Sequence, residues 1–172
     1  MPQCLPARIS LIGFMGSGKS TVGRLLAERI GYRFLDLDEI IESEAGKPVR
    51  EIFATYGEED FRRQETKELY SLTGRDKLVV ATGGGAPIRM ENRAFFKDES
   101  LTVYLEVSFK EFLKRTGSDE ARPLLKLPPK KLKALYEKRL SVYRALGRLI
   151  MTGCKSPENI TEEIISLLGA GC

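Results

Sequence analysis

Residues 13–20 form a complete phosphate-binding motif. They read Gly-Phe-Met-Gly-Ser-Gly-Lys-Ser and fill every fixed position of the G-x-x-x-x-G-K-[ST] pattern. The apolar run at 9–12 precedes the motif, and apolar residues spaced as one helix face follow it at 22–30. A glycine loop at a helix N-terminus favours anions, because its backbone N–H groups are unhindered and the helix dipole is positive there. We therefore expect the chain to bind a nucleoside triphosphate.

The motif also predicts individual contacts. Lys19 would reach the β- and γ-phosphates, and the Ser20 hydroxyl would bind Mg²⁺. A chance match within a glycine-rich turn is the alternative, but it would not bring a strand and a helix in the required order. The nucleotide-binding residues expected from this loop are Gly16, Ser17, Gly18, Lys19, Ser20 and Thr21.

Length and composition indicate one domain, 1–172, and argue against membrane insertion. The chain has 172 residues, and no apolar run approaches the ~20 residues of a membrane span. The N-terminus has no charged region followed by an apolar stretch, so no signal peptide is expected. Three scattered cysteines without metal-ligand spacing suggest inert thiols in a reducing compartment, and we expect a cytoplasmic protein that is a monomer.

Charge limits the partners and the chemistry. The net charge of +4 is small, and the basic residues are mostly interleaved with acids, so a nucleic-acid partner is not expected. The chain has no histidine, which leaves Asp, Glu, Lys, Tyr or Cys as the general base.

Strand and helix patterns alternate along the whole chain. Such alternation, with apolar strands, predicts an α/β fold in three layers, with a parallel sheet covered by helices on both faces. The expected strands are 8–12, 33–37, 77–81, 101–105 and 148–151. The expected helices are 19–30, 38–45, 48–55, 58–73, 89–97, 108–116, 129–146 and 157–168.

Residues 116–128, between two predicted helices, are polar and rich in Gly and Pro. A long loop within a compact domain is typical of a lid, and Arg122 within it favours this interpretation. A closing lid would exclude water during phosphoryl transfer.

Two aspartates follow the second predicted strand. Strand alternation places Asp36 and Asp38 on one face, with Leu37 turned away. One carboxylate could hold Mg²⁺, while the other orients an acceptor hydroxyl and takes its proton. The structural alternative is that they cap the following helix, with Asp38 as the better candidate.

Two arginines and three glycines complete the candidate site. Arg62 lies early in a helix, with Glu65 one turn on, and Arg139 falls inside an apolar stripe of another helix. A charge on a core-facing position needs an internal acid or an anionic ligand, unless it extends to solvent. Two guanidinium groups facing carboxylates suit a substrate that carries both an acid and hydroxyls. The Gly83–Gly85 run at a strand end indicates that backbone approaches another group closely.

Taken together, these residues resemble the shikimate kinase family. The resemblance covers essentially the whole chain, with short motifs whose order and spacing are specific. The motifs lie at 13–21, 36–38, 52–63, 83–86, 115–117, 122–125 and 139–144.

The resemblance implies a nucleoside-monophosphate-kinase-like fold, a P-loop NTPase architecture with a five-stranded parallel sheet. It implies Mg²⁺-dependent transfer of the ATP γ-phosphoryl group to the 3-hydroxyl of shikimate, in chorismate and aromatic amino-acid biosynthesis. The catalytic residues would be Lys19, Asp38 and Arg122, and the metal residues Ser20 and Asp36. The shikimate-binding residues would be Asp38, Arg62, Gly83, Gly84, Gly85 and Arg139.

The adenine side departs from the family pattern. Arg115 would lie along the adenine, but the loop after the last strand has Lys155 where family members commonly place an arginine. Lysine cannot stack as a planar guanidinium does, so Lys155 is expected only as a substitute contact.

Three other functions remain open. A gluconate kinase has the same fold and also binds a hydroxylated acid, and only the Asp38, Arg62, Gly84 and Arg139 set favours shikimate. A GTP-dependent switch usually carries Asn-Lys-x-Asp, which this chain lacks. A nucleic-acid-dependent ATPase fits poorly with the dispersed charge.

Overall fold

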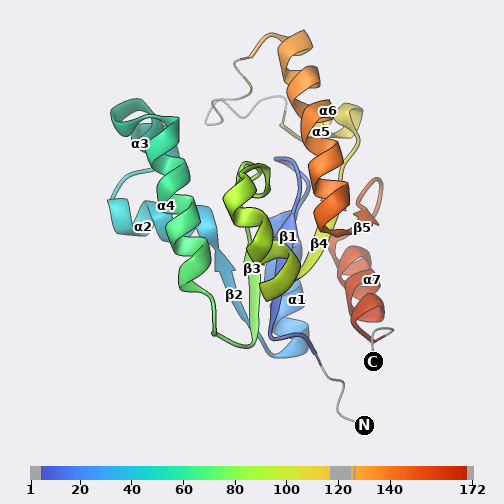
Figure 1. Ribbon diagram of the computed structural model, residues 1–172. Helices are drawn as coiled ribbons and strands as arrows, with labels where there is room; N and C mark the ends of the chain where they lie inside the picture. The colour runs from blue at the N-terminus through green and yellow to red at the C-terminus, as the bar shows by residue number, and fades with distance from the viewer. Residues whose placement is uncertain (1–4, 117–124, 126, 170–172) are drawn as a thin grey trace.

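A central five-stranded parallel sheet organises the molecule (Figure 1). The computed structural model describes residues 5–116, 125 and 127–169. The strand order across the sheet is β2-β3-β1-β4-β5, so the first strand lies in the middle. The strands are β1 (Arg8–Ile12), β2 (Arg33–Asp36), β3 (Leu78–Ala81), β4 (Leu101–Glu106) and β5 (Arg148–Met151). The expected five-stranded parallel α/β sheet is confirmed.

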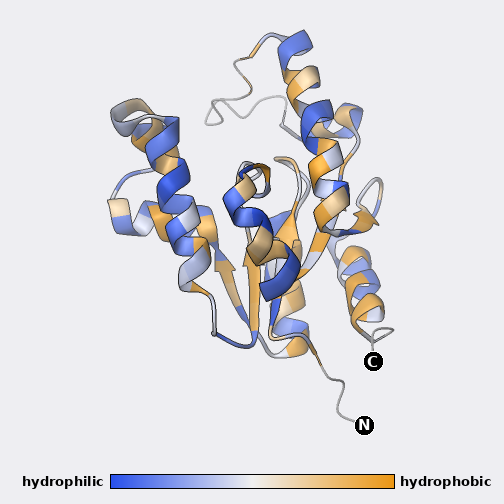
Figure 2. Cartoon of the chain, in the orientation of Figure 1, coloured by the Kyte–Doolittle hydropathy of each residue, from blue (hydrophilic) through white to orange (hydrophobic). Residues whose placement is uncertain are grey.

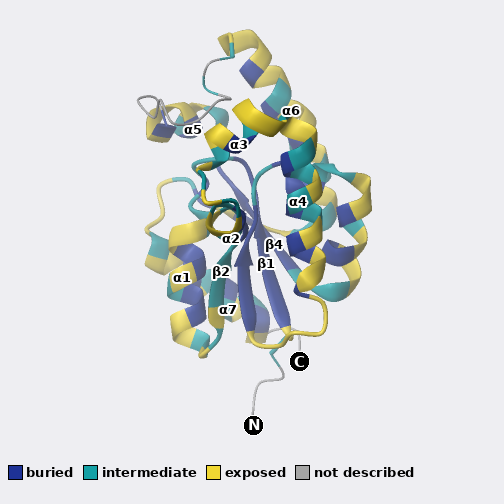
Figure 3. Ribbon diagram, turned by 90° about the vertical axis from the view of Figure 1, so that its left-hand side faces the viewer, coloured by how far each residue is buried: buried dark blue, intermediate teal, exposed yellow. Residues whose placement is uncertain are grey.

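Helices cover both faces of this sheet. Ile9 and Leu11 of β1 face one core with α1 (Lys19–Ile30) and α7 (Pro157–Gly169), whereas Ile12 faces the other. This second core includes residues of α4 (Glu58–Ser71) and α6 (Pro129–Leu146). Every residue of β1 is buried, and the central strands are flanked by helices with exposed outer faces (Figure 3), whereas the edge strands β2 and β5 are partly exposed.

Two groups of helices rise beyond the carboxyl end of the sheet. On the side of β2, α2 (Leu37–Ala45), α3 (Val49–Tyr56) and α4 share a small core of Ile41, Ile52 and Phe61. On the other side lie α5 (Phe109–Thr116) and α6, and the strand ends point toward the space between the two groups (Figure 1). The hydropathy of the strands and of the inward helix faces accounts for this arrangement (Figure 2).

The helix predicted at 89–97 is present only as irregular helical turns, not as a regular α-helix. That region holds short 3₁₀ turns, η1 (Ala86–Ile88) and η2 (Met90–Asn92), followed by a π-helical turn, η3 (Phe95–Glu99). The buried Asn92 amide donates to the Ala86 carbonyl at 2.9 Å and fixes the first part as turns. Phe95 and Phe96 are consecutive and both buried, which a wider helical turn allows.

The boundary between β2 and α2 also differs from the prediction. Leu37 is the first residue of α2 rather than the last of a strand, so strand alternation does not place Asp36 and Asp38. Asp36 caps the helix, because its Oδ1 accepts from the Asp38 backbone N–H at 3.1 Å. The capping role therefore belongs to Asp36, not to Asp38.

Other boundaries agree with the sequence. Strands at 8–12 and 148–151 and helices at 19–30 and 129–146 match to the residue. The Ser156 hydroxyl accepts from the Asn159 backbone N–H at 3.2 Å, as expected of the cap of α7. Within the described residues, no helix is both long and apolar enough to cross a bilayer.

Candidate active site

The phosphate loop curls between β1 and α1 in the expected conformation. Gly16 and Gly18 have φ angles of +71° and +93°, which favour glycine. The Lys19 ammonium donates to the carbonyls of Gly13 at 2.9 Å and Phe14 at 3.0 Å, inside the curl. The loop thus brings backbone N–H groups and one cation together at the N-terminus of α1.

The predicted loop contacts mostly face one cavity of about 680 Å³. Gly16, Gly18, Lys19, Ser20 and Thr21 line it, whereas the Ser17 side chain is buried beneath the loop. Ser17 Oγ is 3.4 Å from Lys19 Nζ, so Ser17 can affect the cavity by holding the lysine.

Ser20 of α1 and Asp36 at the end of β2 provide a pair of oxygen ligands of the kind that Mg²⁺ prefers. The Ser20 hydroxyl donates to Asp36 Oδ2 at 2.6 Å, and Asp36 Oδ1 is used in capping α2. In the described part of the chain, no cluster of three or more metal-ligating side chains exists. Mg²⁺ in kinases commonly takes one or two protein oxygens together with substrate phosphates, so this pair suits it.

Asp38 is a carboxylate without a fixed partner on its inner oxygen. Its Oδ1 is buried and has no hydrogen-bond partner. Burial, reinforced by the charge of Asp36, raises the pKa of Asp38 from 3.8 to about 6, while Lys19 and Arg62 oppose the rise. A carboxylate with such a pKa is a stronger proton acceptor than an exposed aspartate and is still ionised at neutral pH.

Glu65 is a second buried carboxylate beside Asp38. Its side chain is fully buried, and burial raises its pKa to about 7, although the nearby Arg62 lowers it. Glu65 Oε2 accepts from Arg62 Nη1 at 2.8 Å, and Oε1 has no hydrogen-bond partner. Glu65 does not itself line the cavity, and it acts on the site by holding the Arg62 guanidinium.

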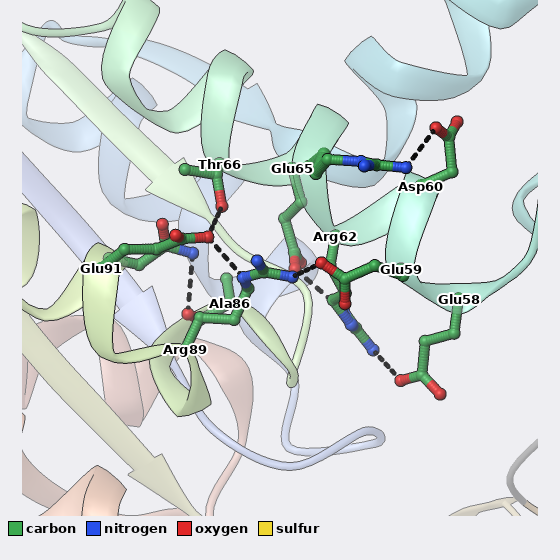
Figure 4. A network of polar contacts seen from close by, with 11 residues as sticks. Glu58, Glu59, Asp60, Arg62, Glu65, Thr66, Ala86, Arg89 and Glu91 are labelled. Atoms are coloured by element: carbon green, nitrogen blue, oxygen red, sulfur yellow. Dashed lines mark hydrogen bonds and ion pairs between the residues drawn. The ribbon is translucent and has the colours of Figure 1, made fainter.

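Arg62 is held on α4 between two acids, as Figure 4 shows. Besides Glu65, it contacts Glu58 through Nη2 at 3.3 Å. The Arg62 side chain is 13% exposed, so an anion in the cavity would meet a largely desolvated guanidinium.

A separate polar network fixes α4 to the turn after the glycine run (Figure 4). Arg89 contacts Glu59 of α4 at 3.0 Å and also pairs with Glu91. Thr66 donates to Glu91 at 3.2 Å. These contacts keep the helix that carries Arg62 next to Gly83–Gly85.

Arg139 is buried on α6 and points at the same cavity. It is 8% exposed, so the alternative of an arginine extending to solvent is wrong. Its guanidinium carbon lies 5.6 Å from the centroid of the Phe14 ring. Its Nε has no hydrogen-bond partner, and no ion pair to it is found among the residues that the structure describes. An anionic ligand in the cavity would meet the Arg139 guanidinium.

Each glycine of the 83–85 run leaves space for charged side chains of the site. A Cβ on Gly83 would collide with Glu65 Oε1 and lie 2.9 Å from Asp38 Oδ1. A Cβ on Gly85 would collide with the Arg62 guanidinium. At Gly84 it would lie 3.5 Å from Arg139 Nη1. The glycine run thus lets four charged side chains converge on one stretch of backbone.

The two expected adenine contacts, Arg115 and Lys155, do not line this cavity. Arg115 bridges two loops, donating to the carbonyls of Gly16 at 3.3 Å and Gly153 at 2.6 Å. Lys155 instead pairs with Glu163 of α7 at 2.6 Å. This arrangement favours Arg115 over Lys155 as an adenine contact, and both remain predictions.

Part of the expected site lies outside the described residues. Arg122 falls there, with most of the predicted lid at 116–128. Of the lid region, Leu127 is described and lines the cavity.

Two further residues shape the site and were not assigned from the sequence. Glu65 was noticed only as an acid one turn from Arg62, a spacing that does predict a pair. Tyr143 belongs to the apolar stripe of α6, and its hydroxyl donates to the Gly84 carbonyl at 2.6 Å. No sequence signal distinguishes such a tyrosine from an ordinary core residue.

Comparisons with known proteins agree with this geometry. The family model described as shikimate kinase matches residues 15–169. A shikimate kinase from Sulfurihydrogenibium sp. (strain YO3AOP1) is 42% identical over 158 residues, which is 92% of this chain and 95% of that protein.

Solved structures give the same result. A shikimate kinase from Acinetobacter baumannii in complex with shikimate superposes with a TM-score of 0.92 at 40% identity, covering 98% of this chain and 95% of that one. A gluconokinase from Sinorhizobium meliloti 1021 has a TM-score of 0.62 at 21% identity, covering 96% of this chain and 93% of its own. The second likeness shows a shared fold only.

Proposed function

The chain belongs to the shikimate kinase family, and from this premise we propose that it transfers the γ-phosphoryl group of ATP to the 3-hydroxyl of shikimate. The products are shikimate 3-phosphate and ADP. The observation that carries the proposal is the cavity itself, because the phosphate loop and the side chains of Asp38, Arg62 and Arg139 line the same space. This is the arrangement that an acid bearing a hydroxyl needs beside a triphosphate.

Arg62 and Arg139 bind the shikimate carboxylate. Both guanidinium groups are largely buried and line the cavity, so a carboxylate between them gains charge-assisted hydrogen bonds away from water. Gly83–Gly85 place backbone beside these groups, and the Gly84 N–H is suited to a substrate oxygen. Holding the acid at two points fixes the ring so that one hydroxyl faces the phosphate loop.

Asp38 accepts the proton of the reacting hydroxyl. As the hydroxyl oxygen bonds to the γ-phosphorus, the bond from phosphorus to the β–γ bridging oxygen breaks and the proton moves to the Asp38 carboxylate. The raised pKa of about 6 suits this role, because the group is ionised at neutral pH yet basic enough to accept. Since phosphoryl transfer is loose, much of the effect of Asp38 lies in orienting the hydroxyl.

Lys19 stabilises the charge on the transferring phosphoryl group, and Arg122 of the lid would act on it from the other side. Ser20 and Asp36 would hold Mg²⁺. The ion, when bound, neutralises charge on the β- and γ-phosphates. Arg115 binds the adenine side, and all these residues come from a single chain.

Formation of ADP in the presence of Mg²⁺, ATP and shikimate tests the proposal. We expect turnover with shikimate and none with gluconate or a nucleoside monophosphate. Turnover with gluconate and none with shikimate would reassign the enzyme to the other acid. Phosphorus NMR of the product would show whether the 3-hydroxyl is the acceptor.

A further inference from the structure

Tyr143 of α6 connects two of the groups that surround the shikimate cavity. Its side chain is completely buried, and its ring lies 5.2 Å from that of Tyr104, centroid to centroid. The hydroxyl donates to the Gly84 carbonyl at 2.6 Å. Arg139, one helical turn earlier, lies close enough to this hydroxyl to lower the pKa of the phenol. A phenol that donates to a carbonyl keeps its acceptor lone pairs, so the Tyr143 hydroxyl can also accept from a guanidinium.

Both partners of this hydroxyl belong to the proposed site. A Cβ on Gly84 would lie 3.3 Å from the Tyr143 hydroxyl and 3.5 Å from Arg139 Nη1, so these groups converge on one small space. The Gly13 carbonyl, which accepts from Lys19, is also 3.3 Å from this point. Tyr143 is therefore the buried link between the guanidinium of α6 and the glycine run after β3.

We propose that Tyr143 is a positioning residue for shikimate binding. It holds the Arg139 guanidinium and the Gly84 peptide in the orientation that binds the substrate carboxylate. The inference rests on the proposed function and deepens it. A long arginine side chain loses rotamer freedom when it binds an anion. A hydrogen bond that fixes the guanidinium beforehand reduces that cost and improves binding. Rotation of the Gly84 peptide is restricted by the same contact.

The charge and burial of the surroundings support this role. Arg139 is 8% exposed and its Nε is buried without a hydrogen-bond partner, so few contacts of its own fix the guanidinium. Burial raises the pKa of Tyr143 to about 12, although Arg139 opposes the rise, so the hydroxyl keeps its proton and remains a donor. The other charged groups acting on this hydroxyl are Arg62 and Glu65.

Helix α6 provides a matched control in Tyr136. Its hydroxyl also donates to a backbone carbonyl, that of Val107 at 2.7 Å, and its ring also packs in the core. It touches neither Arg139 nor the glycine run in any described contact. Replacing either tyrosine by phenylalanine removes one buried hydrogen bond and keeps the ring.

The experiment compares Tyr143→Phe and Tyr136→Phe with the unaltered chain. Shikimate binding is measured by calorimetry, both KM values by ADP release, and folding by thermal unfolding. Tyr143→Phe should raise the shikimate Kd and KM about tenfold or more, as expected for loss of a hydrogen bond to a charged group, and the ATP KM should stay within about twofold. Both substitutions should lower Tm by similar amounts, because each removes one buried hydrogen bond. Tyr136→Phe should leave shikimate binding within about twofold.

An unchanged shikimate Kd in Tyr143→Phe would overturn the inference, as would an equal rise in both variants. A double-mutant cycle with Arg139→Lys adds a second criterion. If Tyr143 acts through Arg139, the two losses combine less than additively, whereas additive losses would contradict the coupling.

A fluorinated tyrosine at 143 tests the same contact without shortening the side chain. Fluorination lowers the pKa of the phenol, so alkaline pH would ionise the hydroxyl and remove its donor. We expect shikimate binding to weaken at alkaline pH in the fluorinated protein alone, and identical pH profiles would overturn the inference. Failure of the unaltered chain to bind shikimate would overturn the proposed function. Normal binding by the unaltered chain together with unchanged binding by Tyr143→Phe would overturn only the inference.

Discussion

Asp38 is expected to destabilise the folded protein at neutral pH while serving the reaction. Its folded-state pKa is about 6, compared with an ordinary value of 3.8, because it is buried and lies near Asp36. The folded chain therefore holds this proton more tightly than the unfolded chain. The free energy of unfolding is consequently greatest below the ordinary pKa and falls as pH rises from about 4 to about 6. Above that window the free energy of unfolding is lower by about 3 kcal/mol, which corresponds to the full rise in the pKa of Asp38.

Asp38→Asn removes the ionisable group and keeps the shape of the side chain. At about pH 7.5 the variant should be roughly 3 kcal/mol more stable, or about 6–12 °C higher in Tm for a domain of this size. At about pH 4 the difference should nearly disappear, because Asp38 is then protonated in the folded state. The same variant should bind ATP normally and lose about 10²- to 10⁴-fold in turnover with shikimate.

Thermal unfolding at the two pH values measures the effect, and exposed Asp98, changed to Asn, is the control for loss of a carboxylate. Asp98→Asn should change Tm by about 1 °C or less at either pH. An Asp38→Asn protein that is no more stable than the parent at neutral pH would refute the reasoning. So would a gain of the same size at both pH values, since the effect must follow ionisation.

Three further predictions distinguish residues that act on shikimate from residues that act on ATP. The kcat/KM for shikimate should fall about tenfold per pH unit below about pH 6, because Asp38 must be ionised; a flat profile would remove it as the base. Arg139→Lys should raise the shikimate KM about 10- to 100-fold with little change for ATP, since lysine cannot bind a carboxylate with two parallel bonds. Equal losses for both substrates would make Arg139 structural. Arg115→Ala should raise the ATP KM about tenfold by loosening the loops it bridges, and unchanged ATP kinetics would contradict that role.

The sequence predicted the features that local rules control. The phosphate loop, the parallel sheet and most helix boundaries follow from glycine spacing, apolar periodicity and capping. Arg139 on an apolar stripe correctly suggested a charge facing inward, and the Gly83–Gly85 run correctly suggested a close approach to backbone.

Features that depend on tertiary packing were missed. Residues 89–97 have helical composition, but in the folded chain they wind as 3₁₀ and π turns, with Phe95 and Phe96 both buried. At 36–38, a strand end and a helix start both direct aspartates toward the same cavity, so the pattern predicted the location correctly through the wrong geometry. The burial of Glu65 and the contacts of Tyr143 arise only when α4 and α6 close around the glycine run.

A crystal structure of the chain with shikimate and ADP would test the central claim most directly. We predict the substrate carboxylate between the guanidinium groups of Arg62 and Arg139, with the 3-hydroxyl within hydrogen-bond distance of Asp38. Shikimate bound outside the cavity, or with its carboxylate away from both arginines, would contradict the account.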